Sequence, residues 1–444
     1  MSAVMANPDV LRGNLRAAIR YVEQNKGRFV SNPGKDFSRN RRISMGEIIT
    51  ALISMNSGTL QRELHKYAAA GGAEISPSAF CQSRAKIKPK AFETVFHKFN
   101  QLCDDGKDLR KYHLYAVDGS CINMARNPDS PCFVHYDSNP QGYCQIHLNA
   151  WYDLDQKIYL EALLQPQPRT DERRALMNMV ERNHFQGRNI LTMDRGYESY
   201  AVFAAILAKP NLDFVCRIKD RKGCMKPLKD WPMEELDKEV SVTITTSQSK
   251  EDKEKGYIFV QTRKHQSKKY SPKTRDGHWP FPSPYTLKFR IVRFLLPTGQ
   301  YETIATSLPR SFTVDEIRTI YARRWGIESS FKQLKYAANL TNLHGRSDDF
   351  VVQEVYAALI AYNFASRAAN MAVVKKKSNC VYSYQVNFTM AVYLCREYLR
   401  HRRGDGEILL QKNQQYTEPI RPGRMDKRKL RPKGFVAFTY RVAA

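Results

Sequence analysis

The pattern of apolar and polar positions divides the chain into a helical part and a strand-rich part. As far as about residue 105, apolar residues recur at helical spacing between polar loops, and Gly-Gly at 71–72 stops one of these segments. This pattern predicts a bundle of short helices. The predicted helices are 9–24, 44–55, 59–70, 76–86 and 89–103.

From residue 111 the pattern becomes alternating and rich in aromatic residues, which is typical of strands. Three strands come first, and later strands alternate with helices. This order predicts an α/β fold, an RNase H-like mixed sheet with flanking helices. The predicted strands are 111–117, 145–154, 158–164, 188–193 and 213–219, and the helices are 171–182 and 199–208.

Residues 220–300 interrupt this order with three further predicted strands, 240–246, 257–262 and 286–294, and with long basic, Pro-rich loops. Loops of this length are uncommon inside compact domains unless they have a function. We therefore expect four parts. These are an N-terminal helical region (1–105), an RNase H-like domain (106–345), a β-rich insertion within it (220–300), and C-terminal helices with a basic tail (346–444).

Residues 317–336, IRTIYARRWGIESSFKQLKY, predict one continuous helix after a strand at 301–307. Thr313 and Glu316 have the spacing of a capping box at its start. At about 100° per residue, one polar line borders one apolar strip, so the polar groups lie at the edge of a buried surface. The line is Tyr321, Arg324, Glu328 and Lys335, and the strip is Ile320, Ile327, Phe331 and Leu334.

The net charge of +27 is high, and it favours a polyanionic partner. Charge alone does not separate DNA from RNA or from an anionic membrane surface. The N-terminal helices could bind a DNA end or form a helical cap, and both interpretations stay open. The basic residues expected on their outer surface are Arg62, Lys66, Arg84, Lys86, Lys88 and Lys90. The tail from Arg396 has few apolar residues, which favours a mobile or nucleic-acid-bound segment.

The nine cysteines are scattered and include no CxxC pair, which favours a reducing compartment over a disulfide framework or a zinc ribbon. The N-terminus has no apolar signal core, and no uninterrupted apolar run has membrane-spanning length. We expect a cytoplasmic protein that has no membrane partner.

Three motifs together resemble the insertion-sequence-four family of bacterial DDE transposases. The spacing of Tyr321, Arg324, Glu328 and Lys335 is similar to the family's Tyr-Arg-Glu-Lys signature. Asp118 in a predicted strand-Asp-Gly-Ser context and Asp194 in strand-Asp-Arg-Gly-Tyr look like the family's two catalytic aspartates. The resemblance runs from about residue 112 to residue 335 and includes the β-rich insertion.

The resemblance implies that Asp118, Asp194 and Glu328 are the catalytic residues and hold two Mg²⁺ ions, with Mn²⁺ as a possible substitute. In-line displacement at a phosphodiester uses two divalent metals, and hard oxygen ligands suit Mg²⁺. The implied partners are double-stranded DNA, at the element ends and at the target, and a second copy of the chain on paired ends. A hairpin intermediate and a bacterial, nucleoid-associated location are implied in the same way.

The resemblance also implies DNA contacts around the carboxylates. Arg324 and Lys335 would hold phosphates, and Tyr321 would bond or stack at the strand end. Trp325 either faces DNA or belongs to the core. The other expected DNA contacts are Arg195 and Arg217, for each of which a structural ion pair is the alternative, and a base-stacking aromatic, Trp279, with Trp231 or Phe281 as alternatives.

The remaining polar candidates have plainer interpretations. His147 falls on an alternating strand and is expected to be packed, and Asp137, Asp153 and Asp155 are expected to form turns. The sequence therefore predicts a Mg²⁺-dependent transposase that cuts and joins DNA. Two alternatives are a metal-dependent nuclease of the same fold and a non-catalytic DNA-binding descendant of a transposase.

Overall fold

The computed structural model describes residues 7–39, 42–104, 111–137, 139–220, 223–260, 282–374, 381–401 and 403–421. In this part of the chain the central feature is a ten-stranded sheet with the order β2-β3-β1-β5-β6-β10-β9-β7-β8, in which β4 pairs with β3. The strands are β1 (His113–Met124), β2 (Phe133–Tyr136), β3 (Asn139–Asp153), β4 (Ile158–Pro166), β5 (Asn189–Met193), β6 (Leu212–Arg217), β7 (Leu236–Thr245), β8 (Ile258–Phe259), β9 (Tyr285–Leu295) and β10 (Tyr301–Thr306).

The sheet is mixed, as the sequence predicts. β1 pairs antiparallel with β3 and parallel with β5, β5 pairs parallel with β6, and β10 pairs antiparallel with β6. β3 pairs antiparallel with β4, and in the turn between them Asp153 accepts hydrogen bonds from the backbone N–H groups of Asp155 and Gln156, as expected of a turn residue. The fold is thus a large mixed sheet with flanking helices, consistent with an RNase H-like transposase fold.

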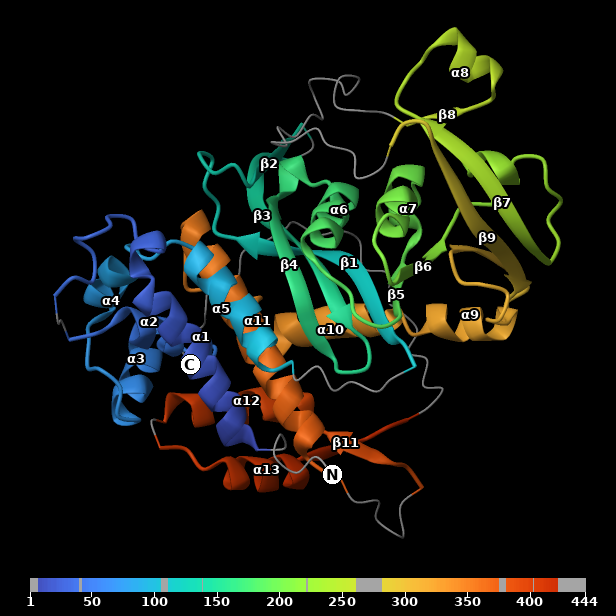
Figure 1. The fold of residues 1–444 in the computed structure, drawn as a ribbon. Coiled ribbons are helices and arrows are strands. Elements are labelled where there is room, and N and C mark those ends of the chain that lie inside the picture. The colour runs from blue at the N-terminus through green and yellow to red at the C-terminus, as the bar shows by residue number, and fades with distance from the viewer. Residues whose placement is uncertain are drawn as a thin grey trace.

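Alternate residues of β1 belong to two different cores. Leu114 and Ala116 lie in one apolar cluster with α10 (Trp325–Tyr336) and α11 (Asp348–Met371). Tyr115 and Val117 lie in the other cluster with α6 (Glu172–Arg182) and α7 (Tyr200–Leu207). Figure 1 shows α6 and α7 together, away from α10 and α11. The period of a strand therefore decides which helices each side chain of β1 meets.

The segment from 220 to 300 extends this sheet. β7 pairs antiparallel with β9, and β9 pairs with β10. β7 and β9 run outward to α8 (Lys250–Glu254) at the tip (Figure 1). The β-rich part is therefore continuous with the central sheet. Residues 261–281, which include Trp279, Phe281 and the basic loop expected to contact DNA, lie outside the described residues.

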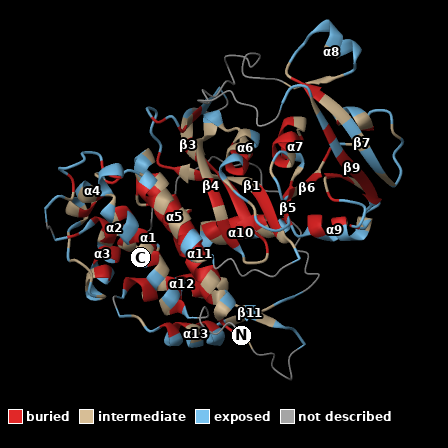
Figure 2. Cartoon of the chain, viewed as in Figure 1, coloured by how far each residue is buried: buried red, intermediate tan, exposed pale blue. Residues whose placement is uncertain are grey.

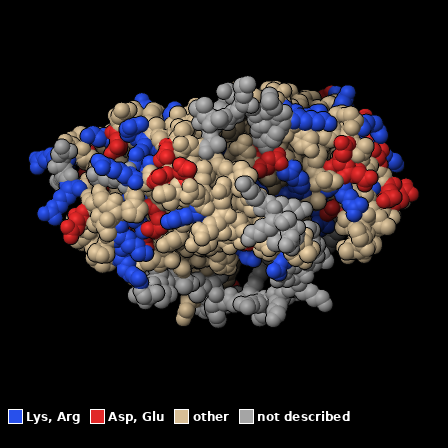
Figure 3. All heavy atoms as spheres, turned by 90° about the horizontal axis from the view of Figure 1, so that it is seen from below, with Lys and Arg blue, Asp and Glu red and all other residues tan. Residues whose placement is uncertain are grey.

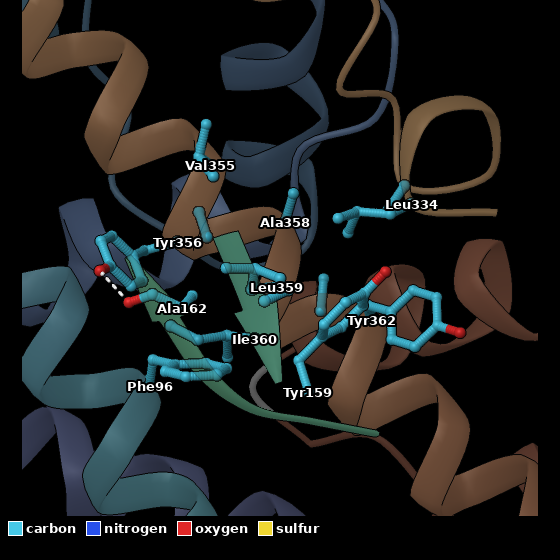
Figure 4. Packing of buried hydrophobic residues seen from close by; sticks show 14 of the residues in the cluster. Phe96, Tyr159, Ala162, Leu334, Val355, Tyr356, Ala358, Leu359, Ile360 and Tyr362 are labelled. Carbon is cyan, nitrogen blue, oxygen red and sulfur yellow. Dashed lines mark hydrogen bonds between the residues drawn. The ribbon is translucent and has the colours of Figure 1, made fainter. Parts of the chain in front are cut away.

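The N-terminal helices pack against the C-terminal ones. They are α1 (Pro8–Gln24), α2 (Met45–Ser54), α3 (Leu60–Ala69), α4 (Pro77–Arg84) and α5 (Lys90–Leu102), and the C-terminal elements are α11, α12 (Phe388–Arg400), α13 (Gly406–Gln415), β11 (Tyr384–Val386) and β12 (Thr417–Pro419). α11 is buried along most of its length (Figure 2). In Figure 4, Tyr356 of α11 packs near Phe96 of α5 and donates a hydrogen bond of 3.1 Å to the carbonyl of Ala162 in β4.

Two expectations about basic residues are wrong. Arg84 does not lie on the outer surface, since it is 1% exposed and its guanidinium contacts α11. The expected mobile or nucleic-acid-bound tail does not begin at Arg396, because Arg396 and Arg400 lie within α12 and are each 3% exposed. Arg400 donates to Glu63 of α3 at 2.7 Å. A basic residue close to an acidic partner from a distant segment can be buried, which composition does not reveal. Residues 422–444 of the tail lie outside the described part.

None of the described helices is both long enough and apolar enough to cross a membrane. In Figure 3, Lys and Arg side chains are interspersed with Asp and Glu over the face that is seen. The net positive charge is therefore spread over that face and is not gathered into one patch.

Candidate active site

Asp118 and Asp194 come from two neighbouring strands, β1 and β5, and lie just beyond the last pair of residues that the two strands share. The parallel register of β1 and β5 pairs His113 with Asn189 and Ala116 with Thr192, a constant offset of 76 residues. Two positions further, the same offset brings position 118 beside position 194. Neighbouring strands lie about 4.8 Å apart, so the two backbones are close.

Both aspartates follow positions that face α10. Along β1, Leu114 and Ala116 belong to the cluster that contains Ile327 and Phe331 of α10, and along β5 so does Ile190. Positions 118 and 194 continue these even-numbered series. Glu328 lies on α10 itself. The topology thus directs all three predicted carboxylates toward one side of the sheet.

The expectation that Asp118 ends its strand is wrong. β1 continues to Met124, because its antiparallel pairing with β3 runs unbroken from Tyr115 to Met124. The described pairing of β1 with β5 stops at Ala116, two residues before Asp118. Asp118 therefore lies where β1 and β5 separate, and its Oδ1 accepts the N–H of Gly119 at 2.8 Å. Asp194 does follow the end of its strand, and its Oδ1 accepts the N–H of Gly196 at 2.8 Å.

The expectation of one continuous helix over 317–336 is also wrong. The segment forms α9 (Val314–Ala322) and α10 (Trp325–Tyr336), with the capping box of Thr313 and Glu316 at the start of α9. Between the two helices the backbone N–H of Arg324 bonds to the carbonyl three residues earlier, and the N–H of Ile327 does the same. Arg323 and Arg324 keep helical dihedral angles. The break is thus a local tightening of the helix, and the apolar strip Ile320, Ile327, Phe331 and Leu334 stays buried.

A buried arginine bridges the carboxylates. Arg324 is 5% exposed, and its Nη2 donates to Glu328 Oε1 at 2.9 Å. Its Nη1 lies 3.7 Å from Asp118 Oδ2, which is within ion-pair distance but too far for a hydrogen bond. Its Nε and Nη1 have no hydrogen-bond partner among the described residues. Arg324 therefore retains unused donors beside two acidic groups.

The pKa of Asp118 is raised from 3.8 to about 6, chiefly because burial disfavours its charged form. Asp194 and Glu328 raise it further, whereas the Gly119 hydrogen bond and Arg324 lower it. These interactions show that the three carboxylates lie in one electrostatic neighbourhood. The pKa of Arg324 is itself raised, since the opposing effect of burial is outweighed by Tyr321, Glu328 and Asp118.

The chemistry of this group suits a divalent cation, because its donors are carboxylate oxygens and their mutual repulsion favours a positive charge between them. Among the residues that the structure describes, however, no three His, Cys, Asp or Glu side chains lie close enough together to hold a metal ion. In this arrangement the guanidinium of Arg324 supplies the positive charge between Asp118 and Glu328. Closure of the carboxylates around a metal stays a prediction.

Tyr321 and Lys335 extend the site on either side of Arg324. Tyr321 is 5% exposed, and burial raises its pKa to about 12. Burial lowers the pKa of Lys335, and the Cys121 thiol of β1 acts in the opposite direction. Within the described part of the chain no carboxylate lies at ion-pair distance from Lys335. The half-buried ammonium thus lacks an acidic partner.

The other predicted DNA contacts have varied positions. Trp325 is 58% exposed, so it does not belong to the core, and the Arg324 guanidinium lies 5.3 Å from its ring. Arg217 forms an ion pair of 3.3 Å with Glu302, as its structural interpretation expects. Arg195 is exposed in the turn after β5. Trp231 packs at the edge of the core shared by α6 and α7.

Several residues near the carboxylates have no motif that would single them out. Glu302 acts on the pKa of Tyr321, and burial raises the pKa of Glu302 itself. Tyr197 is 1% exposed, and besides burial its pKa is raised by Glu172, Asp118 and Asp194. His147 is buried, as expected, but it pairs with Glu172 at 3.0 Å. Only the strand register and the position of α6 bring these groups together.

A family model and a solved structure match this chain. The model of the transposase DDE domain family matches residues 109–364, more than half of the chain. No curated protein matches the chain. Among solved structures, a piggyBac transposase synaptic complex with hairpin DNA is similar at 10% sequence identity and a TM-score of 0.46, covering 96% of this chain and 88% of that one. By the family match, the chain belongs to the transposase DDE domain family.

Proposed function

We propose that the chain is a Mg²⁺-dependent DNA transposase of the insertion-sequence-four type, which cleaves DNA at the ends of its element and joins them to a target. One observation carries this proposal. Asp118 and Asp194 lie just beyond the paired ends of β1 and β5 and act on each other electrostatically together with Glu328, and Arg324 bridges Asp118 and Glu328 while its Nε and Nη1 have no hydrogen-bond partner among the described residues. The family match and the Tyr-Arg-Glu-Lys spacing support it.

Asp118, Asp194 and Glu328 would hold the two metal ions. When bound, the metals would activate the attacking oxygen and stabilise the leaving one. Mn²⁺ would substitute, because it also takes oxygen ligands. The carboxylates would then have their charge compensated by metal in place of Arg324, whose guanidinium would be released toward the DNA.

Arg324, Lys335 and Tyr321 would position the DNA strand at the carboxylates. The Nε and Nη1 of Arg324 have no hydrogen-bond partner among the described residues, and each would donate to a phosphate oxygen. Lys335 would contribute a point charge further along β1, where no acidic side chain of the described chain competes for it. Tyr321 would bond at the strand end, with the Arg217–Glu302 ion pair beside it.

The wider DNA contacts follow from the overall charge of +27 and from the arrangement of elements. We assign the N-terminal helices of 1–105 to binding of the element ends and residues 106–345 to the catalytic domain. Within it, residues 220–300 would project to the DNA, and Trp279, Trp231 or Phe281 would stack a base. Arg195 and Trp325 are exposed near the carboxylates and would contact the strand. A second copy of the chain would act on the paired end.

The test is cleavage of a linear DNA that carries the inverted repeats flanking the coding region. Asp118→Ala, Asp194→Ala and Glu328→Ala should each abolish metal-dependent cleavage. Binding of the same DNA should persist, because the basic surface supplies most of the affinity. The matched control is Asp137→Ala, an exposed turn aspartate, which should cleave normally. Normal cleavage by any of the three site variants contradicts the assignment.

Two further measurements separate the alternatives. A pre-cut end that is never joined to target DNA, although intact ends are cleaved, indicates a nuclease that only hydrolyses. Absence of Mg²⁺ and Mn²⁺ binding by titration calorimetry, together with retained DNA binding, indicates a non-catalytic descendant.

A further inference from the structure

A cysteine, a histidine and a glutamate form a chain of contacts near the carboxylates. Cys121 and His147 are cross-strand neighbours in the register of β1 and β3. The Cys121 sulfur lies 3.4 Å from His147 Nδ1, and His147 Nε2 lies 3.0 Å from Glu172 Oε1. The histidine and glutamate make an ion pair, although the direction of the N–H is poor for a hydrogen bond. The order of the three groups is that of an activated nucleophile, its imidazole and an orienting carboxylate.

Gly119 leaves the space that this arrangement needs. A Cβ atom at position 119 would lie 2.3 Å from His147 Nε2 and 2.4 Å from Glu172 Oε1. Any other residue there would push the imidazole or the carboxylate away. The pair therefore lies directly over the backbone that follows Asp118.

The His147 imidazole is held in its charged form. Burial lowers its pKa, but the contacts with Cys121 and Glu172 outweigh burial and raise the pKa to about 9. A protonated imidazole beside a thiol stabilises the thiolate by ion pairing. Lys335 adds a second positive charge, since the Cys121 thiol acts on its pKa.

The other described cysteines lack such an environment. Cys132, Cys144, Cys216 and Cys395 are buried. Cys81 and Cys103 are partly exposed, but burial raises the pKa of each thiol. Cys224 is partly exposed and has no histidine contact in the described structure. Cys121 is partly exposed as well, and its second contact is Gln167 Oε1 at 3.2 Å.

We propose that Cys121 is a reactive thiol, a modification site for peroxides and soft alkylating electrophiles, activated by His147 and Glu172. With hydrogen peroxide, the Cys121 thiol first gives its proton to water, and the sulfur then attacks one peroxide oxygen. An S–O bond forms and the O–O bond breaks. The departing hydroxide takes up that proton to give water. The sulfur loses two electrons to the peroxide and becomes a sulfenic acid.

The modified group would lie within the same strand as Asp118, three residues further along β1. Added bulk on sulfur would press on Gln167 and His147, which is packed over Gly119. Modification of Cys121 would thus displace side chains that pack against the backbone next to Asp118, without contacting the Asp118 carboxylate itself.

The experiment measures labelling of each cysteine in the full-length protein, without DNA, by iodoacetamide and peptide mass spectrometry. A parallel arm uses hydrogen peroxide and a sulfenic-acid trap. Cys121 should react at least roughly tenfold faster than Cys224 at pH 7, because the imidazole 3.4 Å away stabilises negative charge on the attacking sulfur. His147→Asn should bring the Cys121 rate down to that of Cys224.

Glu172→Gln is the second variant, since a partly exposed residue at the start of α6 tolerates an isosteric change even where His147→Asn does not fold. It should slow Cys121 several-fold and leave Cys224 unchanged. The proposal is overturned if Cys121 in the folded wild type reacts no faster than Cys224, or if neither variant slows it. None of these readouts depends on DNA cleavage, so they stand apart from the proposed function.

Discussion

Two buried arginines, Arg84 and Arg324, show how alike a structural and a site residue can look in sequence. Arg84 is 1% exposed and Arg324 is 5% exposed. Each donor nitrogen of Arg84 has a partner: Nε donates to Gln353 at 2.6 Å, Nη1 to Glu354 at 2.9 Å and Nη2 to the Phe350 carbonyl at 2.6 Å. Arg324 donates to Glu328 alone, and its Nε and Nη1 are unsatisfied among the described residues.

The difference indicates what each guanidinium is for. Unsatisfied buried donors are costly, so proteins seldom keep them where only stability matters. Arg84 fastens α4 to α11 as a satisfied hydrogen-bonding group. Arg324 lies among carboxylates that repel one another and keeps donors for an additional anion. This contrast supports a phosphate as the missing partner of Arg324.

The largest effect is expected for Arg84→Met. Removing this guanidinium takes away the 2.9 Å ion pair of the buried Glu354 with Arg84, which should cost about 3–5 kcal/mol of unfolding free energy. Glu354 also accepts the N–H groups of His344 and Gly345, so the loss should fall short of complete unfolding. Urea denaturation followed by circular dichroism measures it. If Arg84→Met lowers the unfolding free energy by less than an average surface substitution does, Arg84 does not stabilise the packing of α4 on α11.

The same substitution at the other arginine, Arg324→Met, should have the opposite profile. The substitution removes the ion pair with the partly exposed Glu328 but also relieves two buried unsatisfied donors, so unfolding free energy should change by no more than about 1 kcal/mol. Cleavage of element-end DNA should fall by roughly 100-fold, the size expected when a charge-stabilising donor is lost. If Arg324→Met destabilises the fold as much as Arg84→Met and folded protein cleaves normally, the two arginines do not differ in role.

Much of this site could be predicted from the sequence, and the failures have physical reasons. The capping box, the apolar strip and the strand end before Asp194 depend on neighbours along the chain, which the sequence displays. The fate of Arg84 depends on partners 269 and 270 residues away. The division between α9 and α10 changes only hydrogen bonds, because both linking arginines keep helical dihedral angles. The approach of Cys121 to His147 needs the register of β1 and β3.

The third prediction concerns Asp118, whose raised pKa marks the same acidic group. The folded protein holds a proton on Asp118 between pH 3.8 and about 6 that the unfolded chain releases, so this carboxyl lowers stability increasingly as the pH rises through that range. In a chelator, Asp118→Asn should raise unfolding free energy by about 1–3 kcal/mol at pH 7.5, since one pKa unit corresponds to about 1.4 kcal/mol. The gain should vanish near pH 4.

Asp137→Asn is the matched control for this pH series, because Asp137 is exposed in the turn between β2 and β3. It should leave the unfolding free energy unchanged throughout. An Asp118→Asn variant that is less stable than the wild type at pH 7.5 would mean that Arg324 stabilises the carboxylate by more than burial and its acidic neighbours destabilise it.

The smallest expected effect is on the salt dependence of DNA binding. It concerns two half-buried lysines, of which one has a hydrogen-bond partner and the other has no acidic partner among the described residues. Lys209 donates to the Glu181 carbonyl at 2.6 Å near the end of α7, whereas Lys335 on α10 has no carboxylate at ion-pair distance in the described chain. If Lys335 binds one phosphate, Lys335→Met should lower the slope of log affinity against log salt by about 1. Lys209→Met should leave the slope unchanged, because its ammonium already has a partner. Equal slopes for both variants and the wild type would show that Lys335 does not bind a DNA phosphate. Of the two cations Arg324 and Lys335, only Arg324 would then remain as a proposed phosphate contact.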